Sequence, residues 1–206
     1  MTRLQRPVLL AASAAILLST AANAAPIEPA ADSAAQRKAL QALTTCLAEA
    51  RPRWARQTLA LPYLSQPQAN VAAEALTGRD NCVAGSDAEV TFRTSSLVGN
   101  LAEHFVRAEV DKTDSKQLNA ALFALTPLNV TEDFALCVTA RNPGAARGLA
   151  ISEPGSDAEM TAAHQFARLV EECTNTGEQL KVDVQALRAL VSTALYRGIT
   201  ATLGKN

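Results

Sequence analysis

The residues with the most regular chemical spacing in this sequence are its four cysteines, Cys46, Cys82, Cys137 and Cys173. The first two are 36 residues apart, and so are the last two. Cysteines in an exported chain usually form disulfides, whereas zinc ligands usually come as closely spaced pairs, which are lacking here. We therefore expect two disulfides rather than a metal site or four free thiols, and four cysteines allow three pairings.

Two arginines, Arg56 and Arg147, are the next candidates for chemistry because they occupy matching positions in the two halves of the chain. One interpretation is structural: each guanidinium binds helix-end carbonyls or a carboxylate within its own half. The other is an anion-binding groove between the halves, extended by Arg51, Arg53 and Trp54. On this second interpretation Arg56, Arg147 and Trp54 are candidate binding residues.

Asn100 and His104 form a polar pair four residues apart, so a helix would present both on one face. Their counterparts in the second half, Leu190 and Ala194, are apolar. Either both polar residues lie at a helix edge in water, or they belong to a polar site with a histidine, the side chain whose charge can change near neutral pH. We expect them to be partly buried near the contact between the halves.

The sequence contains no recognised catalytic motif: it lacks a glycine-rich phosphate loop, a nucleophile elbow and an HExxH pair. A helix cap accounts for Ser156, and neither His104 nor His164 has a companion at metal-ligand spacing. Adjacent acids such as Glu132-Asp133 are expected on solvated helix faces. We predict no catalytic residue, no metal and no cofactor, and an enzyme with a Ser-His-Asp site is the less favoured alternative.

The cysteine spacing indicates an internal duplication. A shift of 91 residues superimposes the first pair of cysteines on the second pair, and after the second cysteine the shift becomes 90. We predict two homologous halves, about residues 35–110 and 126–203, joined by a polar connector. If one unit was doubled, each half keeps its own bridge, Cys46–Cys82 and Cys137–Cys173, although exchange between the halves also satisfies the symmetry. Further aligned pairs are Pro52 with Pro143, Arg56 with Arg147, Ser65 with Ser156, Leu97 with Leu187 and Arg107 with Arg197.

The elements that position these residues are predicted to be helices, because apolar residues recur at helical spacing in both halves. Pro52 and Pro143 are expected to open short helices, the second of which Asn142 can cap. Val90–Phe92 and Leu180–Val182 are the strand-like segments, and both are too short to build a sheet. The fold class is therefore all-α, a compact helical array of two disulfide-bridged units.

Local patterns also predict which side chains cap these helices and which share one helix face. Ser65 with Gln68 and Ser156 with Glu159 match the capping-box pattern, in which each partner bonds a backbone N–H of the other. In the second half, Val130, Phe134, Cys137 and Arg141 share one helical phase. In the last helix we expect a buried stripe of Leu187, Leu190, Val191, Ala194 and Leu195, with Arg188, Ser192 and Arg197 facing solvent.

The N-terminus has the layout of a secretory signal, residues 1–24. Arg3 and Arg6 precede the apolar run Val8–Leu18, and Ala22-Asn23-Ala24 supplies small residues for cleavage before Ala25. That run is shorter than the roughly 20 residues of a membrane-spanning helix. We expect residues 25–34 to be an extended leader, residues 35–206 to be a single all-α domain, and no transmembrane segment after cleavage.

Composition and charge narrow the classes of partner. The chain has 206 residues, of which 48% are hydrophobic and 4% aromatic, and its formal net charge is −1. Such a chain is typical of a globular protein, and it lacks the basic excess that binding to a nucleic-acid backbone requires. Nucleic acid is therefore not an expected partner.

The pattern Cys-x5-Pro-x2-Ala-Arg, then Ser-x2-Gln/Glu, a second Cys and a closing leucine-rich segment occurs in both halves, which close with SSLVGNLAEHFVR and ALRALVSTALYR. In this pattern the chain resembles a group of small exported alphaproteobacterial proteins. The resemblance covers most of the chain after the signal and implies a location in the bacterial envelope, but no activity, substrate or catalytic residue. We expect a non-catalytic interaction protein, periplasmic or secreted, whose partner is another envelope protein. The alternative is a protein that binds a small ligand or anion in a groove between the halves.

Overall fold

The computed structural model describes residues 27–28, 33–77, 82, 93–174 and 182–204. These residues form ten α-helices, one 3-10 turn and one pair of two-residue strands, so the all-α prediction is confirmed. The expected signal peptide, residues 1–24, lies outside the described residues. The elements are β1 (Ile27–Glu28), α1 (Ala34–Ala50), α2 (Pro52–Ala60), α3 (Gln66–Thr77), α4 (Thr94–Glu109), η1 (Val110–Lys112), α5 (Ser115–Ala124), α6 (Val130–Arg141), α7 (Pro143–Ile151), α8 (Asp157–His164), α9 (Ala167–Cys173), β2 (Val182–Asp183) and α10 (Val184–Thr202).

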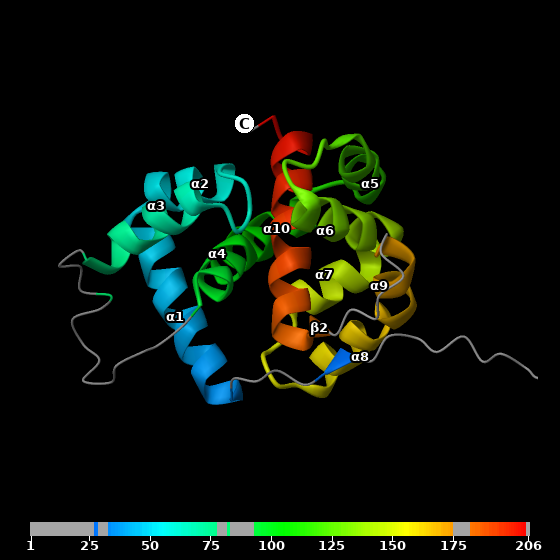
Figure 1. Ribbon diagram of the computed structural model, residues 1–206, viewed down its shortest axis with the longest axis horizontal. Coiled ribbons are helices and arrows are strands. Elements are labelled where there is room, and N and C mark those ends of the chain that lie inside the picture. The colour runs from blue at the N-terminus through cyan, green and yellow to red at the C-terminus, as the bar shows by residue number, and fades with distance from the viewer. Residues whose placement is uncertain (1–26, 29–32, 78–81, 83–92, 175–181, 205–206) are drawn as a thin grey trace, which may run out of the picture.

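Helix α10 runs through the middle of the molecule, with α1–α3 on one side and α5–α9 on the other (Figure 1). Helix α4 packs along it in the most extensive helix–helix interface of the described residues. The core around this pair is aliphatic: Val98 and Leu101 of α4 and Leu187, Val191 and Leu195 of α10 are fully buried. Leucine, valine and alanine thus supply the core of a chain with few aromatic residues.

The sharp turns before α2 and α7 follow from local sequence. Pro52 and Pro143 occupy the first turn of these helices, where the missing N–H costs no intrahelical hydrogen bond. Asn142 caps α7 by accepting the N–H of Ala145 at 3.1 Å, as predicted. Arg51 at the same place before α2 has a similar backbone conformation, with φ −134° against −142° for Asn142.

The capping boxes are confirmed only in their serine half. Ser156 Oγ accepts the N–H of Glu159, but the Glu159 carboxylate accepts the N–H of Gly155 at 2.7 Å instead of that of Ser156. Gly155 has a φ of +79°, the left-handed conformation that turns its N–H toward the carboxylate. The same arrangement recurs before α3, where the three residues are Ser65, Gln68 and Leu64 with its φ of +61°.

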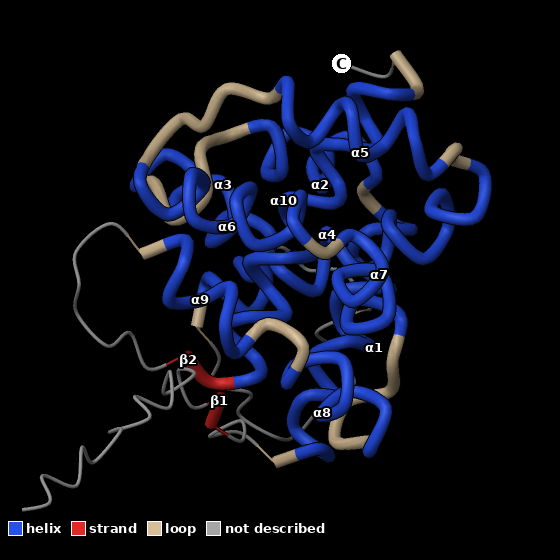
Figure 2. The backbone as a smooth tube through the Cα atoms, turned by 90° about the vertical axis from the view of Figure 1, so that its right-hand side faces the viewer, coloured by secondary structure: helices blue, strands red, loops and turns tan. Residues whose placement is uncertain are grey.

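The expected leader, residues 25–34, is partly built into the fold. Ile27–Glu28 pairs in parallel with Val182–Asp183, which precedes α10 (Figure 2). Helix α1 then begins at Ala34, with Ser33 as its N-cap in a complete capping box with Gln36. The strand-like segment Val90–Phe92 lies outside the described residues.

Two expectations about solvated residues are wrong. The in-phase set of α6 does not form its buried face, since Val130 is 86% exposed and Arg141 is exposed, while α6 buries Ala135, Leu136 and Val138. In α10, Arg188 and Ser192 are buried rather than solvated. Glu132 is also buried, because its carboxylate accepts backbone N–H groups, as described below. Arg188 and Glu132 are buried because their partners come from distant elements, about which spacing within one helix carries no information.

Candidate binding site between the two halves

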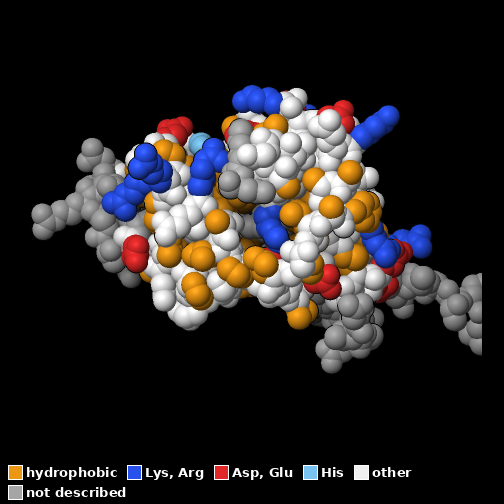
Figure 3. Space-filling view, turned by 90° about the horizontal axis from the view of Figure 1, so that it is seen from above, with side chains coloured by type: hydrophobic (Ala, Val, Ile, Leu, Met, Phe, Trp, Pro, Cys, Tyr) orange, Lys and Arg blue, Asp and Glu red, His pale blue; other side chains and the backbone are white. Residues whose placement is uncertain are grey.

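A groove of about 520 Å³ lies between α2 of the first half and α10 of the second. Figure 3 looks onto the end of the molecule that carries α2, α5 and the C-terminal end of α10, where hydrophobic side chains gather around a hollow that contains basic ones. We call this groove the seam groove. Its lining residues are Arg56, Gln57, Leu59, Ala60, Leu125, Leu128, Tyr196, Arg197 and Thr200. The lining thus combines apolar side chains with two arginines and no carboxylate.

Arg56 is the sequence-predicted candidate that lines this groove. Its guanidinium carbon lies 4.6 Å from the centre of the Phe105 ring, a cation–π distance. The nearest carboxylate is Glu109 of α4, at 3.7 Å, which attracts the charge but is beyond hydrogen-bond distance. Because the side chain of Arg56 is 42% exposed, the ring and the carboxylate hold the guanidinium while leaving it accessible to the groove.

Arg197, the other arginine of the groove, is committed to the fold. It donates to Glu132 Oε2 at 2.6 Å and to the carbonyl of Thr126 at 3.0 Å. The Glu132 carboxylate also accepts the backbone N–H groups of Tyr63 and Leu128, both at 2.8 Å. This one buried acid therefore joins α10, the turn before α3 and the start of α6, and it fixes the wall of the groove.

A small adjoining pocket of about 20 Å³ shares Leu59, Tyr196 and Arg197 with the groove. Ala135, Leu136, Ala194 and others continue the wall, so this pocket is mainly apolar. The site therefore has a polar rim at Arg56 and an apolar interior between the halves.

The other arginine-based candidates lie elsewhere. Arg147 pairs with Asp111 of η1, where both side chains are exposed, and Arg147 does not line the groove. Trp54 is half-buried and donates its Nε1–H to the carbonyl of Val71 at 2.8 Å, which ties α2 to α3. The fold thus brings Arg56 alone of these three to the seam groove, and their binding roles stay a prediction.

Asn100 and His104 line a second, more open groove of about 790 Å³ between α1 and α4. Both are half-buried, and Asn100 Nδ2 donates to the Ser96 carbonyl of its own helix at 2.8 Å. Glu153 adds the one lining residue from the second half, so the pair lies in the first half and only borders the contact between halves. The remaining lining is mixed in charge: Lys38, Gln41, Ala42, Thr45, Cys46, Glu49, Arg107 and Ala108.

A buried ionic cluster between the halves was missed by the sequence analysis. Arg188 of α10 donates to both carboxylate oxygens of Glu103 at 2.7 and 2.8 Å and to Glu159 at 2.9 Å. Arg37 of α1 donates to the same Glu159 oxygen at 2.7 Å. The counterpart of Arg188 under the 90-residue shift is Val98, so the signal used for Asn100, a polar residue matched with an apolar one, could have found it.

The charges of this cluster balance, and the pKa shifts follow from that. Burial disfavours the charge of Glu159, but the hydrogen bonds from Arg37 and the Gly155 N–H and the charge of Arg188 together hold its pKa below the ordinary value. Burial likewise acts to lower the pKa of Arg188, and Glu103 and Glu159 together raise it above the ordinary value. The charged forms of Glu159 and Arg188 are therefore the favoured ones, as suits a structural junction between the halves.

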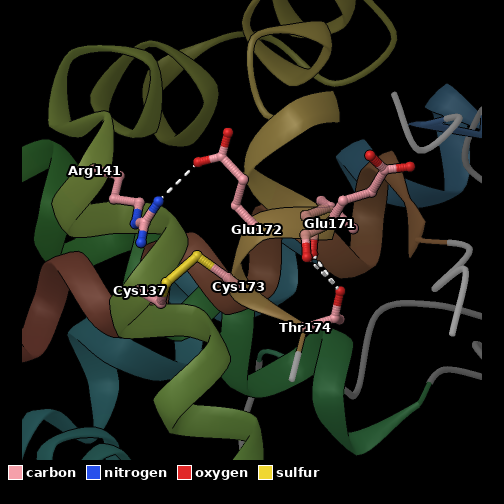
Figure 4. The surroundings of a disulfide bond; sticks show 7 residues. Cys137, Arg141, Glu171, Glu172, Cys173 and Thr174 are labelled. Carbon is pink, nitrogen blue, oxygen red and sulfur yellow. Dashed lines mark hydrogen bonds and ion pairs between the residues drawn. A yellow bond between two sulfur atoms is a disulfide. The ribbon is translucent and has the colours of Figure 1, made fainter. Parts of the chain in front are cut away.

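The four cysteines pair within the halves, as expected. Cys46 bonds Cys82 and Cys137 bonds Cys173, with Cα–Cα distances of 5.7 and 5.9 Å. The second bridge ties α6 to α9, and Arg141 and Glu172 join the same two helices beside it (Figure 4). These cysteines are structural.

Two negative findings concern the described part of the chain. It contains no group of three or more His, Cys, Asp or Glu side chains arranged to hold a metal ion. None of its helices combines the length and the hydrophobicity needed to cross a membrane.

Comparison with protein-family models, curated proteins and solved structures found no match to the chain.

Proposed function

We propose that this chain is a non-catalytic interaction protein of the bacterial envelope, periplasmic or secreted, and that it binds another envelope protein. The observation that carries this proposal is a set of large exposed apolar side chains, one of which, Leu128, lines the seam groove. Leu64, Leu128 and Val130 are 54%, 55% and 86% exposed, and Phe123 of the neighbouring α5 is 68% exposed. We call these four residues the seam patch. Large apolar side chains exposed on a protein surface can mark an interaction site where they adjoin one another.

The seam patch is held in shape by polar contacts beneath it. Glu132 accepts the N–H groups of Tyr63 and Leu128, and the side chain of Asn129 donates to the Tyr63 carbonyl at 2.8 Å. The two bonds to Tyr63 join residues 69 and 66 positions apart in the sequence, from the two halves. A partner would therefore meet a pre-formed surface, which lowers the entropy cost of association.

An extracytoplasmic location is supported by the two disulfides, which persist in oxidising compartments. The basic and apolar N-terminal segment with its small-residue cleavage pattern points the same way.

The test is partner capture with surface variants that place a negative charge on an apolar residue. Cross-linking in the producing bacterium should recover a reproducible envelope partner with the wild-type protein and lose it with Leu64→Glu/Val130→Glu. Ile151→Glu, on α7, is the matched control, because Ile151 is also an exposed apolar residue but lies outside the seam patch. Equal recovery with both variants, or no reproducible partner, would contradict the proposal.

We also propose that the two halves arose by duplication of one helical unit. Helices α2 and α7 are both nine residues long and begin 91 residues apart, and α4 and α10 begin 90 residues apart. Gly99 and Ala189, which touch where α4 and α10 cross, are themselves equivalent under the 90-residue shift. Such self-equivalent contacts are expected on the two-fold axis of an isologous interface. To test this, the two halves are aligned with the 91- and 90-residue shifts, and their similarity is compared with that of shuffled sequences of residues 35–203. A similarity no higher than the shuffled values would contradict a duplication.

A second candidate function is the binding of a small ligand or anion in the seam groove. It is favoured by the groove's volume of about 520 Å³, its apolar walls and its two arginines. These are ordinary properties of small-molecule sites. A thermal-shift screen of sugars, phosphates, carboxylates and cell-wall fragments tests it, because a ligand of the folded state must raise the melting temperature.

A further inference from the structure

We infer that the seam groove binds a small amphipathic monocarboxylate, with its carboxylate on Arg56 and its hydrocarbon chain along Leu59, Leu128 and Tyr196. This inference rests on the proposal that the groove is a ligand site, and it names the chemical class of the ligand. It is carried by the pairing of one accessible cation with apolar lining residues in the same groove.

Of the two arginines in the groove, Arg197 already has acceptors in the protein. Its hydrogen bonds to Glu132 and Thr126 occupy both terminal nitrogens. Arg56, by contrast, makes no hydrogen bond within 3.5 Å to any described residue, and its side chain is 42% exposed. Its planar face rests on Phe105, which leaves its N–H edge to meet an acceptor. A carboxylate matches this edge because the two planar groups form paired hydrogen bonds.

Charge balance favours a ligand with a single negative charge. Glu109 lies 3.7 Å from Arg56 and offsets part of its charge, although it is too far away to form a hydrogen bond. The other cation of the groove lining among the described residues is Arg197, and its charge is already balanced by the buried carboxylate of Glu132. The charge of Arg56 would therefore balance at most half of the charge of a phosphate dianion, whereas it can balance the single charge of a carboxylate.

The apolar wall fits an unbranched chain better than a sugar. Leu59, Leu125, Leu128 and Tyr196 line the groove, and Leu59 and Tyr196 also line the small adjoining pocket, as does Leu136. Leu128 is more than half exposed, so a hydrocarbon chain laid against it would remove apolar surface from water. A sugar would need several hydrogen-bonding side chains, and beyond the arginines the lining offers only those of Gln57, Thr200 and Tyr196.

Calorimetric titration of the full chain with sodium decanoate, below its micelle concentration, tests the inference. We expect saturable binding that Arg56→Gln weakens by at least about tenfold, the worth of a hydrogen bond to a charged group. Arg147→Gln is the matched control, because Arg147 occupies the equivalent position of the other half and lies outside the groove. Octanoate should bind more weakly than decanoate, by about fourfold for each CH₂ removed. Melting curves of each variant establish that it is folded.

The alternative outcomes separate this inference from the function on which it rests. Equal binding of decanoate to wild type and Arg56→Gln, or equal binding of decanoate and neutral decanol, would overturn the assigned headgroup contact. If decanoate gives no heat while phosphate or a sugar raises the melting temperature, the groove is a ligand site and the monocarboxylate is wrong. If no compound of the screen binds, the ligand-binding function fails together with the inference.

Discussion

Gly99 of α4 and Ala189 of α10 are in contact at the point where the two central helices cross. A Cβ atom placed on Gly99 would lie 2.4 Å from the Cβ of Ala189 and 2.7 Å from its Cα. Real Cβ atoms do not come this close to backbone, and neither partner is the end of a flexible side chain. The close approach of the two halves therefore requires glycine at position 99.

Gly99→Ala should consequently lower the free energy of unfolding by about 1–3 kcal/mol, the usual cost of overpacking a core. Gly148→Ala in α7 is the matched control, since its new Cβ would lie 3.7 Å from that of Ala162, an ordinary contact. That variant should gain about 0.5–1 kcal/mol, because alanine favours helix over glycine. Urea unfolding measures both, and equal stability of the two variants would contradict the close crossing.

Arg188→Met should destabilise the protein by about 3–5 kcal/mol, because it leaves Glu103 and Glu159 buried without their shared cation. Arg141→Met is the control: Arg141 and Glu172 form a pair at 2.7 Å, but both side chains are largely exposed. An exposed pair contributes about 0–1 kcal/mol. A similar loss in both variants, measured by urea unfolding, would mean that burial of the cluster does not matter.

Glu159→Gln should show a pH-dependent loss of stability relative to the wild type. Because the pKa of Glu159 is lowered on folding, its ionised form stabilises the protein at pH values above the ordinary glutamate pKa. That contribution is lost as the pH falls from this value through the lower pKa of the folded state. The gap between wild type and Glu159→Gln should thus be widest near neutral pH and narrow in acid. Glutamine suits the position sterically, as Gln68 occupies the equivalent place in the first half. A gap that stays constant in urea titrations from pH 7 to 3 would contradict this.

Removing either disulfide should cost about 3–4 kcal/mol, because each closes a loop between cysteines 36 residues apart. Paired Cys-to-Ser variants and the reduced wild type should therefore melt at lower temperature than the oxidised protein. Non-reducing digestion and mass spectrometry should recover Cys46 linked to Cys82 and Cys137 linked to Cys173. A melting temperature unaffected by reductant would contradict the stabilising role.

Replacing Asn100 with Leu and His104 with Ala should leave stability within about 0.5 kcal/mol of the wild type. The reason is that Asn100 bonds only its own helix among the described residues, and His104 meets Phe105 edge-on. Thermal unfolding checks this. If partner capture is lost while stability is unchanged, the pair belongs to a binding surface, whereas a clear drop in melting temperature would make it a structural network.

The features that could be predicted from sequence are those set by residues within one or two helical turns. Pro52 and Pro143 start helices, Asn142 and Ser156 cap them, and the cap geometry needs no distant partner. The disulfide pairing was also accessible, because equal spacing of the cysteines made the within-half bridges the simplest result of a duplication.

The charged core could not be predicted, because its partners come together only in three dimensions. Arg188 was assigned to solvent since a charged residue beside an apolar stripe usually is, yet its carboxylates lie 85 and 29 residues away in the chain. Val130 is the opposite case, an apolar residue that is exposed. It is in phase with half-buried Phe134, but it precedes the part of α6 that packs on the core. The sequence predicted a groove between the halves lined by Arg56 and Trp54, and the structure places Arg56 in such a groove. Trp54 does not line it, because its indole N–H donates to the carbonyl of Val71.

The ionic cluster of Arg37, Glu103, Glu159 and Arg188 also sets the order in which the fold can be completed. It takes one member from each of α1, α4, α8 and α10, so it cannot close until residue 188 has been synthesised. The bridge between Cys46 and Cys82 lies wholly within the first half, whereas Arg37 and Glu103 each pair with a residue of the second half. Although each half carries its own bridge, the two halves share one charged interior, so neither half by itself holds every partner of these buried charges.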